Sequence, residues 1–127
     1  MSFPAHFPNG CPPDTVEDAQ GEVFRFVRRN DPPVAANFVS NVAGSKWYDP
    51  AKECQACGLS VLRTEQDVRE ARRVSPWAKK QKVAKARLSP DWGKLAPTES
   101  TLIPNHHTWW VSEGKQPERI FVVVAIK

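Results

Sequence analysis

The sequence predicts a single small domain of the α+β class. Its 127 residues suffice for one domain, and 40% hydrophobic with 25% charged residues is typical of a soluble globular chain rather than a disordered one. About five short segments have the alternating or β-branched pattern of strands, and two carry helix-start signals. Twelve prolines divide the chain into short elements.

The first third of the chain is predicted to hold an arm, a strand and a helix. Residues 1–21 are expected to form an irregular N-terminal arm packed on the body, since no apolar period runs through them. Glu22–Arg28 is predicted to be a strand with two phenylalanines on one face and Arg25 on the other. A short helix is expected to begin at Asp31-Pro32-Pro33, because aspartate caps a first turn and proline fits it.

The middle of the chain is predicted to contain a loop, a strand and a second helix. Residues 41–57 have the composition of a loop, and Gly58–Leu62 is expected to be a short buried strand. Thr64 is predicted to cap a helix from Glu65 to about Arg73, because its hydroxyl can accept from the N–H three residues on. The apolar residues of this helix are expected to face inward.

The last third is predicted to supply three strands. Lys82–Leu88 alternates in the manner of a half-exposed strand, and Ser89–Thr101 is expected to be a loop. A strand is predicted over Asn105–Ser112, and a hairpin turn over Glu113–Pro117. Arg119–Ile126 is the most apolar segment, so a central place in the sheet is expected for it.

Charge and hydropathy exclude several classes of protein. The longest apolar run is far shorter than a membrane span, and the first ten residues lack the regions of a signal peptide, so a cytoplasmic protein without a membrane partner is expected.

The net charge is +4, with nine basic residues between Arg63 and Arg87. This basic stripe is either a solvent-exposed face or a surface that attracts a polyanion. A nucleic-acid partner has weaker support, because no recognised reader motif accompanies the charge.

The three cysteines allow several interpretations. An odd number of cysteines without an export signal does not predict a disulfide framework. Cys54 and Cys57 have the spacing of half a zinc knuckle, but the second half is missing, so no metal site is predicted. A redox pair and two small half-buried loop residues are the other interpretations.

Two segments carry candidate functional side chains. On a strand over Asn105–Ser112, His106 and Thr108 share one face while His107 and Trp109 share the other. Such residues form either a packed core strand or a ligand site, where an indole can stack on a flat ring and a neutral histidine can donate or accept. Arg25 needs an anion in mid-strand, which is either a carboxylate or a ligand phosphate.

Three blocks, taken in order, resemble the minimal ADP-ribosyltransferase-like toxins, particularly the small effector of the bacterial type VI secretion system. The first block is Phe24-Arg25-Phe26 on an early strand. The second is Gly58-Leu59-Ser60-Val61-Leu62 followed by a polar helix. The third is His106-His107-Thr108-Trp109 on a late strand.

The resemblance implies a split, twisted, mainly antiparallel sheet with two short helices that binds NAD⁺ in its central cleft. By position in the family, the residues implied for catalysis are Arg25, Ser60 and His107, and those implied for NAD⁺ binding are Arg25, Phe26, His106, Thr108 and Trp109. The late catalytic glutamate of many members has no clear counterpart, so ADP-ribosyl transfer, NAD⁺ hydrolysis and a non-catalytic relative all stay open. An antitoxin or immunity protein is the implied partner, and the sequence does not identify a macromolecular target.

The function expected from the resemblance is that of an NAD-binding toxin acting in the bacterial cytosol, within a conflict or toxin–antitoxin system. Two alternatives of other classes remain. One is a protein-interaction module that uses the tryptophan-rich strand and the basic surface, because tryptophan anchors interfaces. The other is a small domain stabilised by zinc at Cys54 and Cys57.

Overall fold

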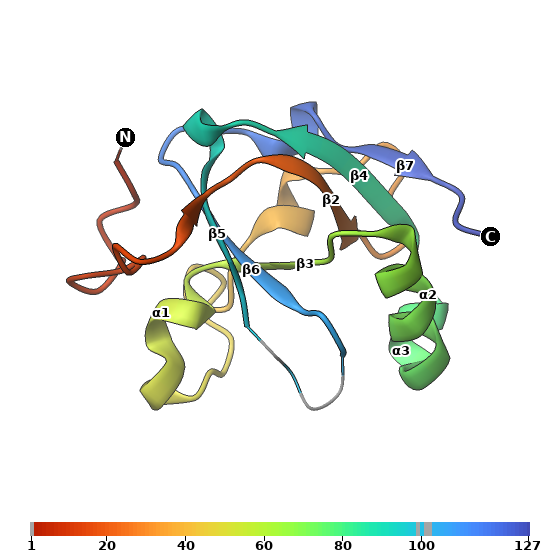
Figure 1. The fold of residues 1–127 in the computed structure, drawn as a ribbon, viewed down its shortest axis with the longest axis horizontal. Helices are drawn as coiled ribbons and strands as arrows, with labels where there is room; N and C mark the ends of the chain where they lie inside the picture. Colours follow the sequence, from red (N-terminus) through yellow and green to blue (C-terminus); the bar gives the residue numbers. More distant parts are fainter. Residues whose placement is uncertain (1, 99, 101–102) are drawn as a thin grey trace.

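A computed structural model gives the structure of residues 2–98, 100 and 103–127, and these residues form a mixed α+β architecture (Figure 1). The described strands are β1 Glu17–Asp18, β2 Gly21–Phe26, β3 Leu59–Val61, β4 Val83–Leu88, β5 Gly93–Pro97, β6 His107–Val111 and β7 Val122–Val124. The α-helices are α1 Glu53–Ala56, α2 Glu65–Val74 and α3 Pro76–Lys79. Single 3₁₀ turns lie at η1 Ala35–Phe38, η2 Pro50–Lys52, η3 Pro90–Trp92 and η4 Pro117–Arg119.

The strands form two antiparallel sheets that meet at one point. One sheet has the order β1-β5-β6-β3 and the other has the order β2-β4-β7. Between them, the backbones of Phe24 and Leu62 exchange two hydrogen bonds of 2.8 and 2.9 Å. In a continuous antiparallel pair, the next mutual pair would join Phe26 to Ser60. The Ser60 carbonyl instead accepts from the side chain of Arg25, so the split between the sheets opens beside these two residues.

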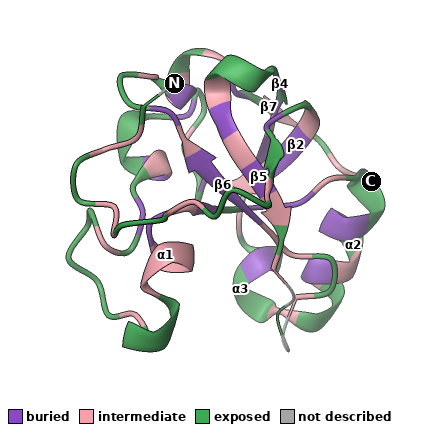
Figure 2. Ribbon diagram, turned by 60° about the vertical axis from the view of Figure 1, so that its left-hand side comes forward, coloured by how far each residue is buried: buried purple, intermediate pink, exposed green. Residues whose placement is uncertain are grey.

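The larger of two buried clusters joins side chains from both sheets and includes Trp109. Figure 2 shows buried segments in purple along strands of both sheets. The Trp109 indole is fully buried, donates its N–H to the carbonyl of Trp92 at 2.9 Å, and packs against the ring of Phe121. Trp110 is also buried and donates to the carbonyl of Cys54 at 2.8 Å. Because buried indoles with satisfied N–H groups stabilise a core, the tryptophan strand holds the sheet together and is not an exposed interaction surface.

Helix α2 agrees with its sequence signals. The Thr64 hydroxyl accepts from the backbone N–H of Asp67 at 3.0 Å, as the capping pattern predicts. Val68 and Ala71 are fully buried, which confirms the inward face. The helix ends at Val74, and α3 begins directly afterwards at Pro76, because proline fits a first turn and Ser75 caps it through the N–H of Ala78.

Three predicted loops or arms contain regular structure. The expected loop over 41–57 includes η2 and α1, where Asp49 accepts from the N–H of Ala51. The expected loop over Ser89–Thr101, of which residues 99 and 101 lie outside the described residues, contains β5. That strand forms although glycine and proline bound it, because all five of its residues pair with β6. The N-terminal arm contributes β1, which pairs with β5.

The predictions for two other segments were wrong in part. The apolar segment Arg119–Ile126 forms only the three-residue β7 at the edge of its sheet, where Val122 is 57% exposed. Its first residues are taken up by the 3₁₀ turn that begins at Pro117. The helix expected after Asp31-Pro32-Pro33 is the single 3₁₀ turn η1, because the side chain of Asn37 accepts from the Val34 N–H and closes that turn.

The cysteine prediction was also wrong. Cys11 in the N-terminal arm forms a disulfide with Cys54 in α1, across 43 residues of sequence. The prediction failed because the sequence shows neither that the arm folds back onto α1 nor which cysteines meet. Cys57 is free and buried, and burial raises the pKa of its thiol. Because Cys54 is not a free thiolate, the Cys54–Cys57 spacing does not form half of a zinc site.

Candidate functional site

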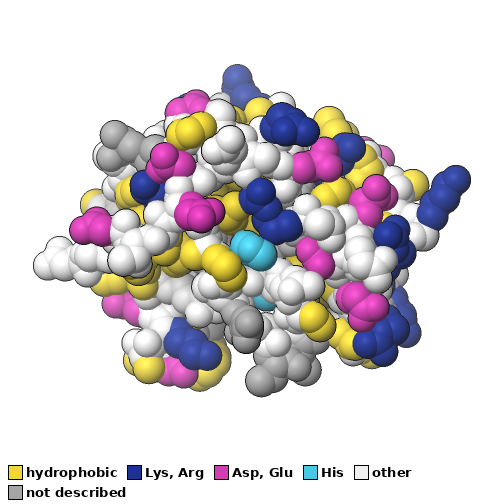
Figure 3. All heavy atoms as spheres, in the orientation of Figure 1, with side chains coloured by type: hydrophobic (Ala, Val, Ile, Leu, Met, Phe, Trp, Pro, Cys, Tyr) yellow, Lys and Arg dark blue, Asp and Glu magenta, His cyan; other side chains and the backbone are white. Residues whose placement is uncertain are grey.

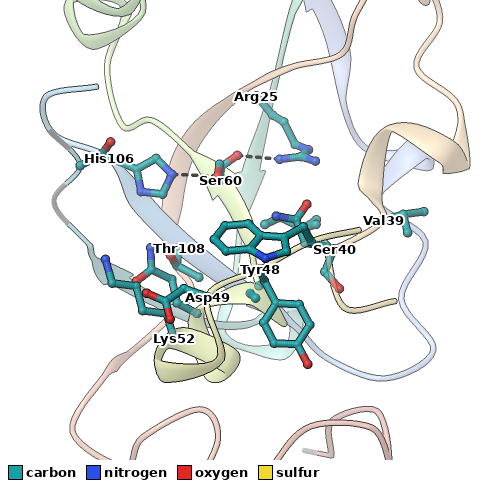
Figure 4. Close-up of a pocket in the computed structure, with 16 residues that line it drawn as sticks. Arg25, Val39, Ser40, Tyr48, Asp49, Lys52, Ser60, His106 and Thr108 are labelled. Atoms are coloured by element: carbon teal, nitrogen blue, oxygen red, sulfur yellow. Dashed lines mark hydrogen bonds between the residues drawn. The ribbon is translucent and has the colours of Figure 1, made fainter. Parts of the chain in front are cut away.

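A cavity of about 320 Å³ opens where the two sheets separate. One wall comes from the ends of β2, β3 and the residues leading into β6, and the other comes from the segment that leads into α1 (Figure 4). Its lining includes charged, polar and aromatic side chains: Arg25, Trp47, Tyr48, Asp49, Lys52, Ser60, His106 and Thr108. A volume of this size lies within the range of small-molecule sites.

Arg25 supplies a positive charge at the back of this cavity. Its Nε donates to the carbonyl of Asn37 at 2.9 Å and one terminal nitrogen donates to the carbonyl of Ser60 at 2.8 Å, while Phe38 lies beneath the guanidinium at 5.8 Å. In the described part of the chain, no carboxylate lies within salt-bridge distance of it. Burial lowers the pKa of Arg25 to about 10, so the group stays charged at neutral pH without a protein anion beside it.

Ser60 and His106 form a hydrogen-bonded pair on the same wall. The Ser60 hydroxyl lies 2.7 Å from Nε2 of His106, and Nδ1 of His106 lies 2.9 Å from the carbonyl oxygen of Thr98. Because a carbonyl oxygen only accepts, Nδ1 carries the ring proton and Nε2 is left to accept from the serine. Figure 4 shows His106, Ser60 and Arg25 joined in one row.

The charge state of His106 follows from its surroundings. Burial is the main cause that lowers its pKa, and electrostatic interactions with His107 and Arg25 act in the same direction, while the hydrogen bond to Thr98 opposes them. The imidazole is therefore neutral at physiological pH, which matches the tautomer set by the Thr98 carbonyl. A neutral imidazole with an accepting Nε2 can take a proton from a hydroxyl group.

Backbone and side-chain contacts fix the position of His106. Asn105, directly before it, has a positive φ of 60°, a conformation that asparagine tolerates better than most residues. The Asn105 amide donates to the buried carboxylate of Asp67 on α2 at 2.9 Å. The Thr98 hydroxyl lies 2.9 Å from Nδ1 of His106 and 2.7 Å from the hydroxyl of Thr108, so the residue that follows β5 links the ring to β6.

The opposite wall brings aromatic and charged side chains to the rim. Trp47 is 83% exposed although it is large and apolar. Tyr48 donates its hydroxyl to the carboxylate of Glu53 at 3.1 Å, and this bond is the main cause that raises the tyrosine pKa. Lys52 adds a second cation to the cavity, and Asp49 is the acidic residue among the described lining residues. The Cys11–Cys54 disulfide and the Trp110 indole anchor this wall to the body.

The structure brings together four of the residues named from the sequence. Arg25, Ser60, His106 and Thr108 line the cavity. Phe26 lies beside it, in a hollow of about 30 Å³ that Arg25, Ser60 and His106 also border. This arrangement follows from strand alternation, which turns His106 and Thr108 to one face of the sheet.

Two residues of that set lie elsewhere. His107 faces a separate hollow next to β1 and β5, and its Nδ1 is 2.9 Å from the carbonyl of Asn105. Trp109 is in the core and cannot form a stacking wall for a ligand. Between the two neighbouring histidines, the structure therefore selects His106 for the cavity.

Sequence reasoning missed the second wall and the support of His106. Trp47, Tyr48 and Lys52 lie in a segment expected to be a plain loop. The available signal was the pair of adjacent aromatic residues in a polar loop, since loops carry binding residues more often than elements do. No pattern marks Thr98, because its role arises only from the pairing of β5 with β6.

The basic residues of the 63–87 stripe lie mostly away from the cavity. Figure 3 shows lysine and arginine side chains gathered on the side of α2 and α3. Several of them have partners: Arg73 pairs with Glu70 at 3.1 Å, and Lys85 pairs with Glu22 at 3.6 Å. Among the described residues, no group of three or more histidine, cysteine or acidic side chains is arranged to hold a metal ion.

The comparisons with known proteins supply no relative. No protein-family model matches the chain, and no curated protein and no solved structure is significantly similar to it. None of the helices in the described residues has the length and apolar character needed to cross a membrane. We therefore infer the function from the geometry of the cavity.

Proposed function

We propose that the protein binds NAD⁺ in the cavity beside Arg25 and belongs, by its architecture, with the ADP-ribosyltransferase-like toxins. The single observation that carries the proposal is the Arg25 guanidinium, which is desolvated, faces a cavity and has no carboxylate partner among the described residues. A pyrophosphate supplies the missing negative charge and matches the fork of the guanidinium.

The position of the cavity supports the same assignment. The resemblance implies a split antiparallel sheet with an early-strand arginine and a second-strand serine at the cleft. In the structure, Arg25 and Ser60 come from such strands and meet where the two sheets separate. The cavity accommodates part of a dinucleotide, and the rim with Trp47 and Lys52 is open to the remainder. An exposed indole offers a flat surface on which a nicotinamide or adenine ring stacks.

The proposed chemistry is cleavage of the bond between nicotinamide and ribose. Nicotinamide departs as a neutral molecule, and the ribose carbon passes through an oxocarbenium-like state before water or a target nucleophile attacks it. The Asp49 carboxylate and hydrogen-bonding groups of the cavity are the groups proposed to lower the energy of that state. In place of the late glutamate of the family, this wall presents the neutral base His106.

The proposed biological role is that of a toxin in bacterial conflict, restrained by an antitoxin or immunity protein that covers the cavity. Such a role needs no membrane insertion, because NAD⁺ is present in the bacterial cytosol. The Cys11–Cys54 disulfide fits a chain that passes through an oxidising compartment before it acts.

The proposal is tested by inducing the protein in a bacterium while growth and cellular NAD⁺ are followed together. We expect growth arrest with a fall in NAD⁺, and Arg25→Gln relieves both. Arg69→Gln is the matched control, because it also removes one arginine but from the exposed surface of α2, where the side chain contacts Gln66. Normal growth with steady NAD⁺ in cells that contain folded wild-type protein would contradict the proposed role.

A further inference from the structure

The geometry around Ser60 points to a reactive serine. We propose that Ser60 is a nucleophile, that His106 is the base that activates it, and that the Thr98 carbonyl orients the base. The three groups form one chain: the Ser60 hydroxyl lies 2.7 Å from Nε2, and Nδ1 lies 2.9 Å from the carbonyl oxygen. A nucleophile and a base within hydrogen-bond reach, with the base held by a third group, is the arrangement that activates hydroxyl groups in enzymes.

The fold places this pair where a substrate can reach it. Ser60 lies on β3 opposite Thr108 on β6, so His106 is its diagonal neighbour two residues along the adjacent strand. Both side chains line the cavity, and the Ser60 residue is exposed whereas the imidazole is half-buried.

The surrounding charges define the class of substrate. Arg25 touches the backbone of Ser60, and Lys52 lines the same cavity, so the reacting molecule carries negative charge near its electrophilic carbon. The neutral state of His106 is maintained mainly by burial, and the charge of Arg25 acts in the same direction. On forming the imidazolium, Nδ1–H keeps its hydrogen bond to the Thr98 carbonyl, which supports the developing charge.

The step is balanced with NAD⁺ as the substrate, and in this form it rests on the proposed function. The Ser60 oxygen forms a bond to the C1′ carbon of the nicotinamide ribose, and the bond from C1′ to nicotinamide breaks. Nicotinamide leaves as a neutral molecule with the electron pair, and the hydroxyl proton passes to Nε2 of His106. Water or a target hydroxyl then attacks C1′ and breaks its bond to the Ser60 oxygen, which takes the proton back from Nε2 of His106, while the proton of the attacking hydroxyl is released to solvent.

The reactivity of Ser60 is tested without NAD⁺ by a fluorophosphonate probe, whose phosphorus bonds to an activated serine oxygen while fluoride leaves. We expect peptide mass spectrometry to locate the label at Ser60. The labelling rate of His106→Ala should be at least about 100-fold lower, because a general base contributes about 100-fold or more. Ser89→Ala is the matched control, because that serine bonds the carboxylate of Asp91 and no histidine, so labelling is unchanged. Absent labelling, or equal labelling in His106→Ala, overturns the inference.

The same purified proteins are then incubated with NAD⁺ to separate this inference from the proposed function. Nicotinamide release with an ADP-ribose adduct on Ser60 supports both. Fluorophosphonate labelling of a protein that binds no NAD⁺ refutes the proposed function and leaves the reactive serine in place. NAD⁺ cleavage at the wild-type rate by folded Ser60→Ala refutes the role of the serine and leaves the proposed function in place.

Discussion

Loss of the Cys11–Cys54 disulfide is expected to remove a large part of the stability of this domain. The bond closes a loop across 43 residues, and the chain-entropy relation for a loop of that length gives about 4 kcal/mol at 25 °C. The whole stability of a domain of this size is about 5–15 kcal/mol. The bond also ties the irregular arm to α1, whose residues form one wall of the cavity.

The measurement is urea unfolding of the wild-type protein with and without a reductant, beside the double variant Cys11→Ser/Cys54→Ser. We expect the reduced protein and the double variant to lose the same free energy of unfolding, about 4 kcal/mol. The urea dependence should rise, since the unfolded chain without the bond exposes more surface. The reductant should not change the double variant. A loss below about 1 kcal/mol in both samples would refute the loop-closure reasoning.

Three further predictions follow from single residues. Gly58→Ala places a Cβ 2.3 Å from Cγ2 of the buried Thr108. We therefore expect urea titrations to show a free energy of unfolding that is lower by about 1–3 kcal/mol. An unchanged free energy of unfolding would contradict this contact. His106 has a lowered pKa in the folded state, so the unfolded chain binds more protons. Stability should therefore fall as the pH drops from about 6.5 toward the folded pKa, and His106→Gln should reduce this fall; equal pH profiles by thermal melting would refute it. Trp47→Ala should weaken NAD⁺ binding in a fluorescence titration without changing the melting temperature. Trp77→Ala removes another exposed indole, which packs on Phe26, and should leave NAD⁺ binding intact. Equal effects of the two substitutions would contradict a role for the cavity rim.

The sequence predicted the strand pattern around the site better than its environment. Alternation along β6 correctly separates His106 and Thr108 from His107 and Trp109, because side chains on a strand point to opposite faces. It does not show which face meets the cavity. That choice depends on how the β2 sheet meets β3 at the Phe24–Leu62 bridge, which is a contact between distant segments.

Other features depend on tertiary contacts that leave no local pattern. β5 forms by pairing with β6 although its own sequence favours a loop, and β7 lies at a sheet edge although its sequence is the most apolar. The disulfide joins Cys54 to the arm and not to the nearby Cys57, so sequence spacing alone was misleading. The capping of α2 by Thr64 was predictable, because it involves only residues three apart.

The central proposal is that Arg25 binds the phosphates of NAD⁺ in this cavity. Its most direct test is calorimetric titration of the folded protein with NAD⁺, for the wild type, Arg25→Gln and Arg69→Gln, with thermal melting to confirm that each variant is folded. We expect binding by the wild type and by Arg69→Gln, and an affinity at least about tenfold lower for Arg25→Gln, because a hydrogen bond to a charged group contributes about 1.5–3 kcal/mol. Equal affinity in all three proteins, or no binding by the wild type, would contradict it.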